Sequence, residues 1–138
     1  MNDVVLNKAA SIQRSTQRAK EEYQMAAGKF AEDFTRQDAA ILNIIRACET
    51  ALDLANLIIR AKKLGIANTS RESFSLLVEG KIISKELGLQ LEKIVAFRNI
   101  AAHEYIKLNI DVVESIIQNN LDDLVAFSKQ SIQLPGLE

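Results

Sequence analysis

The chain has 138 residues, of which 48% are hydrophobic and 25% are charged. These proportions are typical of soluble globular proteins, so they argue against a disordered or a membrane-embedded chain. With 17 Lys and Arg against 18 Asp and Glu, the formal net charge is -1, which excludes a uniformly basic surface and leaves only a local site for nucleic acid.

The first predicted element is a helix from Asn2 to about Tyr23. Asn2 or Asp3 is a suitable N-cap residue. Apolar residues recur along this segment at helical intervals, namely Val5, Ala9, Ile12 and Ala19. The segment lacks the basic start, the long apolar run and the cleavage-like site of a signal peptide, so we expect a cytoplasmic protein.

A long helix is expected from Arg36 to Leu64, after a connector around Gly28. Thr35 begins the sequence TRQD, which is similar to a capping box, and Gly65 stands where a helix should end. The inward face of this helix is expected to consist of Ile41, Ile45, Cys48, Leu52, Ala55 and Ile59.

Polar residues and a single cysteine limit what this second helix can do. Arg46, Glu49 and Asp53 interrupt its apolar sequence well short of the roughly 18 consecutive apolar residues that a membrane span needs. We therefore expect no membrane contact. Cys48 is the only cysteine and the chain has one histidine, which leaves no disulfide and no zinc-ligand spacing. We expect neither a metal nor a cofactor, and a core position for Cys48.

Two helices are expected next. Ser70 can cap the segment RESFSLLVE, and Gly80 is placed to end it. Ser84 can cap a helix from Lys85 to about His103. Apolar residues cover most of the circumference of that helix, as expected of a buried central helix: Leu87, Leu91, Ile94, Val95, Phe97, Ile100 and Ala101.

The last predicted helix begins at Asn109 or Asp111 and continues to about Ser128. Its inward face is expected to consist of Val112, Ile116, Leu121, Leu124 and Phe127. Short connections, the lack of a strand pattern and a single proline, Pro135, favour an all-α fold. We expect an antiparallel up-and-down helical bundle that forms one domain over residues 1–138.

Residues 97–105, FRNIAAHEY, place three polar side chains in an apolar helix. They contain the only histidine, His103, with Arg98 five residues before it and Tyr105 two residues after it. An apolar helical row passes through this segment and comprises Leu87, Leu91, Ile94, Arg98 and Tyr105. An unpaired buried charge costs several kcal/mol, so we expect a carboxylate, a second chain or an anionic ligand to meet Arg98.

Arg98 and His103 cannot easily reach one small ligand from a straight helix. Five residues of α-helix place the two side chains roughly 140° apart around the axis. Either the helix unwinds near Ala102, or two copies of the chain face each other and complete one cleft. In the structural alternative, Arg98 pairs with Glu49 or Asp53 of the second helix. His103 would then bond a backbone carbonyl.

The sequence RNIAAHEY resembles the R-x-x-x-x-H-x-Y signature of the HEPN superfamily, and more closely that of HepT-like toxins from HepT/MntA toxin–antitoxin pairs. The resemblance extends to RACETALDLAN, SRESFSLLVEGKIIS and NIDVVESIIQNNLDDLVAF, and it covers about Thr35 to Phe127. It implies an all-α, HEPN-like homodimer whose facing motifs form a cleft. It also implies a toxin that acts as a metal-independent endoribonuclease on an RNA such as tRNA or mRNA.

The resemblance implies a role for each polar residue of the motif. Arg98 and His103 would be catalytic, with His103 moving a proton and Arg98 holding the phosphate that the RNA 2′-hydroxyl attacks. Asn99 would donate a supporting hydrogen bond. Tyr105 would accept AMP from a cognate MntA-like nucleotidyltransferase antitoxin, which would block the cleft by charge and bulk. Two alternatives are a non-catalytic HEPN module that binds a nucleotide or its nucleotidyltransferase partner, and a helical adaptor in which Arg98 is structural.

Overall fold

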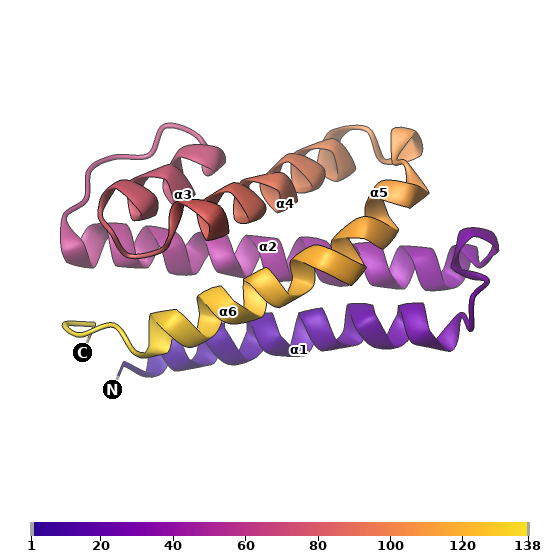
Figure 1. Ribbon diagram of the computed structural model, residues 1–138, viewed down its shortest axis with the longest axis horizontal. Coiled ribbons are helices and arrows are strands. Elements are labelled where there is room, and N and C mark those ends of the chain that lie inside the picture. The colour runs from indigo at the N-terminus through magenta and orange to yellow at the C-terminus, as the bar shows by residue number, and fades with distance from the viewer. Residues whose placement is uncertain (1, 138) are drawn as a thin grey trace.

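The computed structural model describes residues 2–137, and every regular element within that range is helical (Figure 1). The longer helices are α1 (Asp3–Met25), α2 (Phe34–Lys62), α3 (Ser70–Glu79), α4 (Lys85–His103), α5 (Ile110–Ser115) and α6 (Leu121–Ile132). Short turns lie between them, namely η1 (Phe30–Glu32), η2 (Tyr105–Lys107) and η3 (Ile116–Asn120). The all-α fold predicted from the sequence is confirmed. No helix in this range combines the length and the apolar content that crossing a membrane requires.

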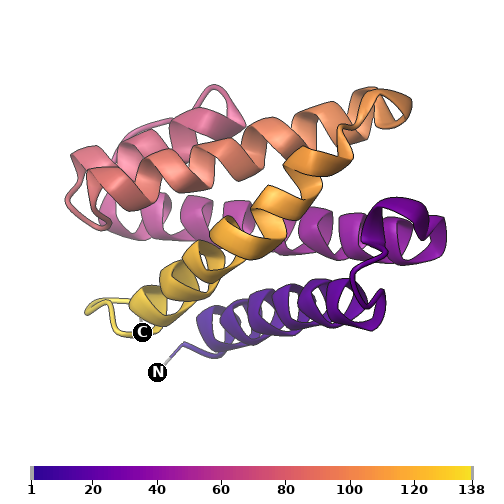
Figure 2. The ribbon, with the colours of Figure 1, turned by 45° about the vertical axis from the view of Figure 1, so that its right-hand side comes forward.

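The helix α2 occupies the centre of the bundle. It packs against α1 on one side and against α3 and α4 on the other, and α4 runs opposite to it (Figure 1). The helix α6 crosses the bundle diagonally and packs mainly on α1 (Figure 2). Small buried residues let the neighbours approach α2 closely, namely Ala40, Ala47, Ala51 and Ala55.

The helix α4 is less enclosed than the sequence predicts. Its inner face is buried through Leu87, Leu91, Ile94, Val95 and Phe97. Ile100, which was expected inside, is 49% exposed, and Leu89 is 50% exposed. The expectation of a fully surrounded helix is therefore wrong, because α2 takes the central place. One face of α4 presents apolar side chains outward.

The helix α2 begins at Phe34, two residues before the predicted start. Its N-cap is Asp33, whose carboxylate accepts a hydrogen bond from the backbone N–H of Arg36 (3.1 Å). The predicted capping role of Thr35 is therefore wrong. A carboxylate is well suited to this place because it also meets the positive end of the helix dipole.

The helix α2 ends at Lys62, also two residues early, because Lys63 adopts the left-handed backbone (φ 55°) that ends the helix. The backbone N–H of Leu64 then bonds the carbonyl of Ile59 (3.0 Å), which is the pattern of a Schellman motif. Gly65 was expected to take this place, and that expectation is wrong.

The limits of the next two helices are predicted more closely. Thr69 caps α3 through its hydroxyl, one residue before the predicted Ser70. Gly80 ends α3, and the hydroxyl of Ser84 caps α4, as predicted. The two N-caps, Thr69 and Ser84, depend on local hydrogen bonds from short polar side chains to the backbone, which is why the sequence reveals them closely.

The helices α3 and α4 approach each other closely at Gly88. A Cβ atom at this residue would overlap the Cγ2 atom of Val78 on α3. The missing side chain of Gly88 therefore sets how near the two helices can lie, and so how α3 is held beside the motif-bearing helix.

The last helix is interrupted where the sequence predicts a continuous one. Asn109 caps α5 by accepting a hydrogen bond from the backbone N–H of Asp111 (2.8 Å), which confirms the start. The π-helical turn η3 then separates α5 from α6. A π turn adds one residue to the helix and shifts its phase. Before that turn Val113 is buried, whereas Val112, predicted to face inward, is 46% exposed.

Candidate functional site at the end of α4

Arg98 lies on the buried face of α4, as the apolar row before it predicts, and 17% of its side chain is exposed. Its Nε atom is 3.2 Å from the Glu49 Oε1 atom on α2, an ion pair whose geometry is not that of a hydrogen bond. Its Nη2 atom donates a hydrogen bond to the hydroxyl of Ser70 at the start of α3 (2.8 Å). The guanidinium is thus fixed between two neighbouring helices. The pairing with Glu49 expected in the structural alternative is present.

Cys48 lies next to Glu49 on α2 and within the field of Arg98. Burial raises the pKa of the Cys48 thiol to about 12, and the positive charge of Arg98 opposes this rise only in part. Such a thiol stays protonated at neutral pH and is a poor nucleophile. Cys48 therefore has the core position that the sequence predicts.

His103 is the last residue of α4, and its side chain is exposed. The helix continues without interruption through Ala102, so the first of the two alternatives, an unwound helix, does not occur. Arg98 and His103 keep the angular separation that a regular helix imposes. Across residues 2–137 the imidazole of His103 makes no hydrogen bond or ion pair, and the expected bond to a backbone carbonyl is not seen.

Tyr105 leaves the helical row on which the sequence placed it. The helix α4 ends at His103, Glu104 leaves the helical conformation (φ -141°, ψ 54°), and Tyr105 begins the turn η2. The hydroxyl of Tyr105 donates a hydrogen bond to the Asp38 Oδ1 atom near the start of α2. The ring is 45% exposed, so it does not close the helix end as a packed core residue.

The environment of the Tyr105 hydroxyl raises its pKa to about 12. Partial burial is the main cause, followed by the hydrogen bond to Asp38 and by the negative charge of that carboxylate. The neutral phenol is therefore strongly favoured. Asp38 was not identified from the sequence, because nothing local marks a contact between residues so far apart in the chain.

Two exposed apolar residues lie near the exposed histidine in the sequence. Ile106 is 98% exposed in η2, and Ile100 is 49% exposed one turn before His103. Asn99 is half-buried beside Arg98, and its side chain makes no hydrogen bond within the described part of the chain. Ile106 was not identified from the sequence, where a single isoleucine between Tyr105 and Lys107 carries no signal of its own.

Arg98 and Tyr105 are tied to one face of α2 at different levels. Their partners, Glu49 and Asp38, are 11 residues apart in the sequence, which corresponds to about three helical turns and roughly 16 Å along the axis. Because α4 runs antiparallel to α2, the motif residues from Arg98 to Tyr105 lie along the length of this face of α2, toward its start (Figure 1). Within one chain the polar groups form a line along α2 rather than a compact cluster.

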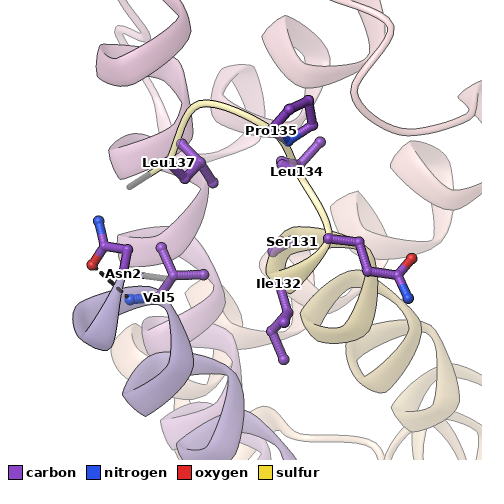
Figure 3. A pocket seen from close by; sticks show the side chains of 8 residues that line it. Asn2, Val5, Ser131, Ile132, Leu134, Pro135 and Leu137 are labelled. Carbon is purple, nitrogen blue, oxygen red and sulfur yellow. Dashed lines mark hydrogen bonds between the residues drawn. The ribbon is translucent and has the colours of Figure 1, made fainter.

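A separate hollow of about 430 Å³ lies where the two ends of the described chain meet (Figure 3). Asn2 and Val5 at the start of α1 line one side of it, and residues from the last turn of α6 and from the segment after it line the other. None of its lining residues titrates, and it lies at the opposite end of the bundle from η2 (Figure 1). Within the described residues, this hollow therefore contains no ionisable side chain that could act as an acid or a base.

A family model described as "Ribonuclease HepT-like" matches residues 12–131. The chain is 43% identical over 127 residues to the mRNA nuclease HepT of Shewanella oneidensis, and the match covers 92% of this chain and 95% of that protein. It is also similar to the tri-AMPylated HEPN toxin of Shewanella oneidensis, solved in complex with the MNT antitoxin. That toxin is 42% identical, with a TM-score of 0.88 and coverage of 94% of this chain and 97% of that one.

A further solved structure is a toxin–antitoxin with AMP-PNP, in which the matching chain is 41% identical, with a TM-score of 0.88. The match covers 95% of this chain and 99% of that chain. Fold, length and sequence therefore agree over nearly the whole chain. The chain belongs to the HepT-like ribonuclease family.

Proposed function

We propose that this protein is the toxin of a toxin–antitoxin pair and acts as an endoribonuclease through a cleft formed by two copies of the chain. The observation that carries the proposal is the contrast between a fixed Arg98 and an exposed His103 without protein partners in the described range. A fixed cation can hold the phosphate and a free imidazole can move a proton, and both assist cleavage of a phosphodiester. The relative named as an mRNA nuclease supports the RNA substrate.

The proposed reaction uses the RNA as its own nucleophile. His103 accepts the proton of the 2′-hydroxyl, whose oxygen attacks the adjacent phosphorus while the bond to the 5′-oxygen breaks. The leaving 5′-oxygen takes up a proton from water, and the products carry a 2′,3′-cyclic phosphate and a 5′-hydroxyl. Imidazole exchanges protons near neutral pH and suits this role. The mechanism uses no metal and predicts full activity in EDTA.

Arg98 stabilises the charge that builds on the phosphate. Glu49 and Ser70 engage its Nε and Nη2 atoms, and its Nη1 atom makes no hydrogen bond to residues 2–137. The guanidinium is thereby held in one orientation and still has N–H donors free for an anion. Donors that are oriented in advance stabilise the charge of the transition state better than water molecules do. Asn99, beside it, supplies a further donor in this proposal.

A homodimer resolves the separation between Arg98 and His103. A two-fold axis brings the same surface of two chains together, so that Arg98 of one protomer can face His103 of its partner. The exposed Ile100 and Ile106 beside the histidine supply apolar surface for such a contact. In this proposal each cleft is therefore composite.

We also propose that Tyr105 accepts AMP from a cognate MntA-like nucleotidyltransferase antitoxin, which silences the toxin. The exposed ring and hydroxyl support this role, as does the AMPylated state of the related HEPN toxin. The attached AMP adds a negative charge and an adenine where RNA must enter. Substitution of Tyr105 by Phe is expected to leave a toxin that the antitoxin cannot neutralise by modification.

The test of the proposed function is growth and RNA cleavage with Arg98→Ala and His103→Ala. Both variants are expected to be folded, harmless to the host cell and inactive on RNA. Should both remain as toxic as the unsubstituted chain, the nuclease proposal fails, and a module that only binds a nucleotide or its nucleotidyltransferase partner becomes the better explanation.

A further inference from the structure

The hydrogen bond between Tyr105 and Asp38 joins two distant parts of the sequence at an accessible surface. The two residues are 67 positions apart, on η2 and on the first turns of α2. Asp38 is exposed and Tyr105 is 45% exposed, so a second molecule can reach the pair. A contact that served stability alone would gain little at such an exposed place.

We propose that Asp38 is the proton acceptor for the transfer of AMP to Tyr105, an inference that rests on the proposed modification of this tyrosine. The Tyr105 oxygen attacks the α-phosphorus of ATP and forms the new P–O bond. The bond between the α-phosphorus and the bridging oxygen breaks, and pyrophosphate leaves. The phenolic proton passes to the Asp38 carboxylate, with which it already makes a hydrogen bond, and from there to water. The toxin thus supplies part of the chemistry of its own inactivation.

The phenol needs such a base. With a pKa of about 12, the Tyr105 hydroxyl is ionised in only about one molecule in 10⁵ at pH 7. Attack by the neutral hydroxyl is efficient only if a neighbouring group takes the proton as the bond to phosphorus forms. Such assistance contributes typically 10²–10⁴-fold to a rate.

Asp38 is the group placed for this role. Glu104 and Lys107, on either side of Tyr105, pair with each other at 3.7 Å. His103 stands at the end of α4 without a hydrogen bond to the tyrosine within residues 2–137. Asp38 faces the hydroxyl from α2 and is the one charged group whose field raises the Tyr105 pKa. The base and the nucleophile are therefore already in hydrogen-bond contact before any nucleotide arrives.

The experiment measures AMP transfer to the full chain by the cognate nucleotidyltransferase at saturating enzyme and ATP. Intact mass and peptide mapping follow modification of Tyr105 over a series of pH values. Asp38→Asn keeps the shape of the side chain and an acceptor oxygen but removes the base. Asp53→Asn is the matched control, since it makes the same change on the same helix, where Asp53 meets Lys8 at 3.6 Å.

We expect Asp38→Asn to slow the transfer at neutral pH by roughly 10²–10⁴-fold, and Asp53→Asn to leave it unchanged. The deficit of Asp38→Asn should shrink steadily between about pH 7 and pH 9, because the phenolate fraction rises with pH and needs no base. Asp38→Glu, which restores a carboxylate, should recover part of the rate. Circular dichroism confirms that each variant is folded.

Two results would overturn the inference in distinguishable ways. If Asp38→Asn is modified as fast as the unsubstituted chain, or slows by the same factor at every pH, Asp38 is not the proton acceptor, and the proposed function stands. If the unsubstituted chain gains no AMP on Tyr105, the proposed modification fails and the role of Asp38 fails with it.

Discussion

Arg98 and Tyr105 both contact α2, Arg98 through an ion pair with Glu49 and Tyr105 through a hydrogen bond to Asp38. The two contacts differ, because Arg98 is held in place and Tyr105 is accessible. The Arg98 side chain is 17% exposed and has partners on two helices. Tyr105 is 45% exposed, has one partner, and stands in a turn rather than a helix. The first arrangement suits a cation that must not move during a reaction. The second leaves the side chain accessible to a second molecule.

The largest loss of RNA cleavage is expected from substitution of His103, the exposed residue of the motif. His103→Ala should lower RNA cleavage by roughly 10²–10⁴-fold, because it removes the proton-transfer group. The exposed imidazole makes no contact to lose within the described residues, so the urea midpoint should hardly change. Equal cleavage by His103→Ala and the unsubstituted chain in a gel assay would remove His103 from the mechanism.

The substitution Arg98→Met tests whether the Arg98 guanidinium serves catalysis or stability. Loss of a preorganised donor should lower cleavage by roughly 10²–10³-fold. The free energy of unfolding should change little, because Glu49, the member of the ion pair that remains, is 53% exposed and keeps its contact with water. A variant that cleaves normally but unfolds much more easily would show that Arg98 is structural. Denaturant unfolding beside the cleavage assay separates these outcomes.

The close packing of α3 on α4, which places Ser70 beside Arg98, is tested at Gly88. Gly88→Ala puts a methyl group against Val78, so α3 must move away from α4, at a cost of about 1–3 kcal/mol in unfolding free energy. Cleavage should fall as well, since Ser70 on α3 holds Arg98. The matched control is Gly28→Ala, where a Cβ atom meets nothing within 4 Å and only the left-handed backbone resists. Unchanged stability of Gly88→Ala would contradict the close packing.

How much of this could be predicted from the sequence depends on the range of the interaction. Gly80, Ser84 and Asn109 act on backbone groups within a few residues, and the helix limits that they set were predicted correctly. The pairing of Arg98 with Glu49 was among the alternatives because a charged side chain in an apolar helical row needs a partner, and Glu49 is a carboxylate on the second helix.

Other features depend on contacts that no local pattern encodes. The hydrogen bond from Tyr105 to Asp38 arises only once α4 ends at His103 and the chain turns back toward α2. The π turn η3 interrupts a helix whose apolar spacing reads as continuous from Val112 to Phe127, so periodicity alone did not reveal it.

The smallest predicted effect is a pH dependence of the free energy of unfolding that comes from Tyr105. The Tyr105 pKa is raised in the folded chain, so the neutral phenol is favoured there. Its contribution to stability is present in full below about pH 10, the phenol pKa of the unfolded chain, and is lost as pH rises toward 12. Stability should therefore fall more steeply across this range in the unsubstituted chain than in Tyr105→Phe. Parallel urea midpoints in the two proteins would contradict this.

The composite cleft is tested most directly by mixing two inactive chains. Arg98→Ala and His103→Ala are co-expressed with different tags, and the mixed dimer is purified through both tags. If Arg98 of one protomer works with His103 of its partner, each mixed dimer has one intact cleft and should recover about half of the unsubstituted activity. A mixed dimer as inactive as either parent would contradict the account, because no chain in it carries both residues.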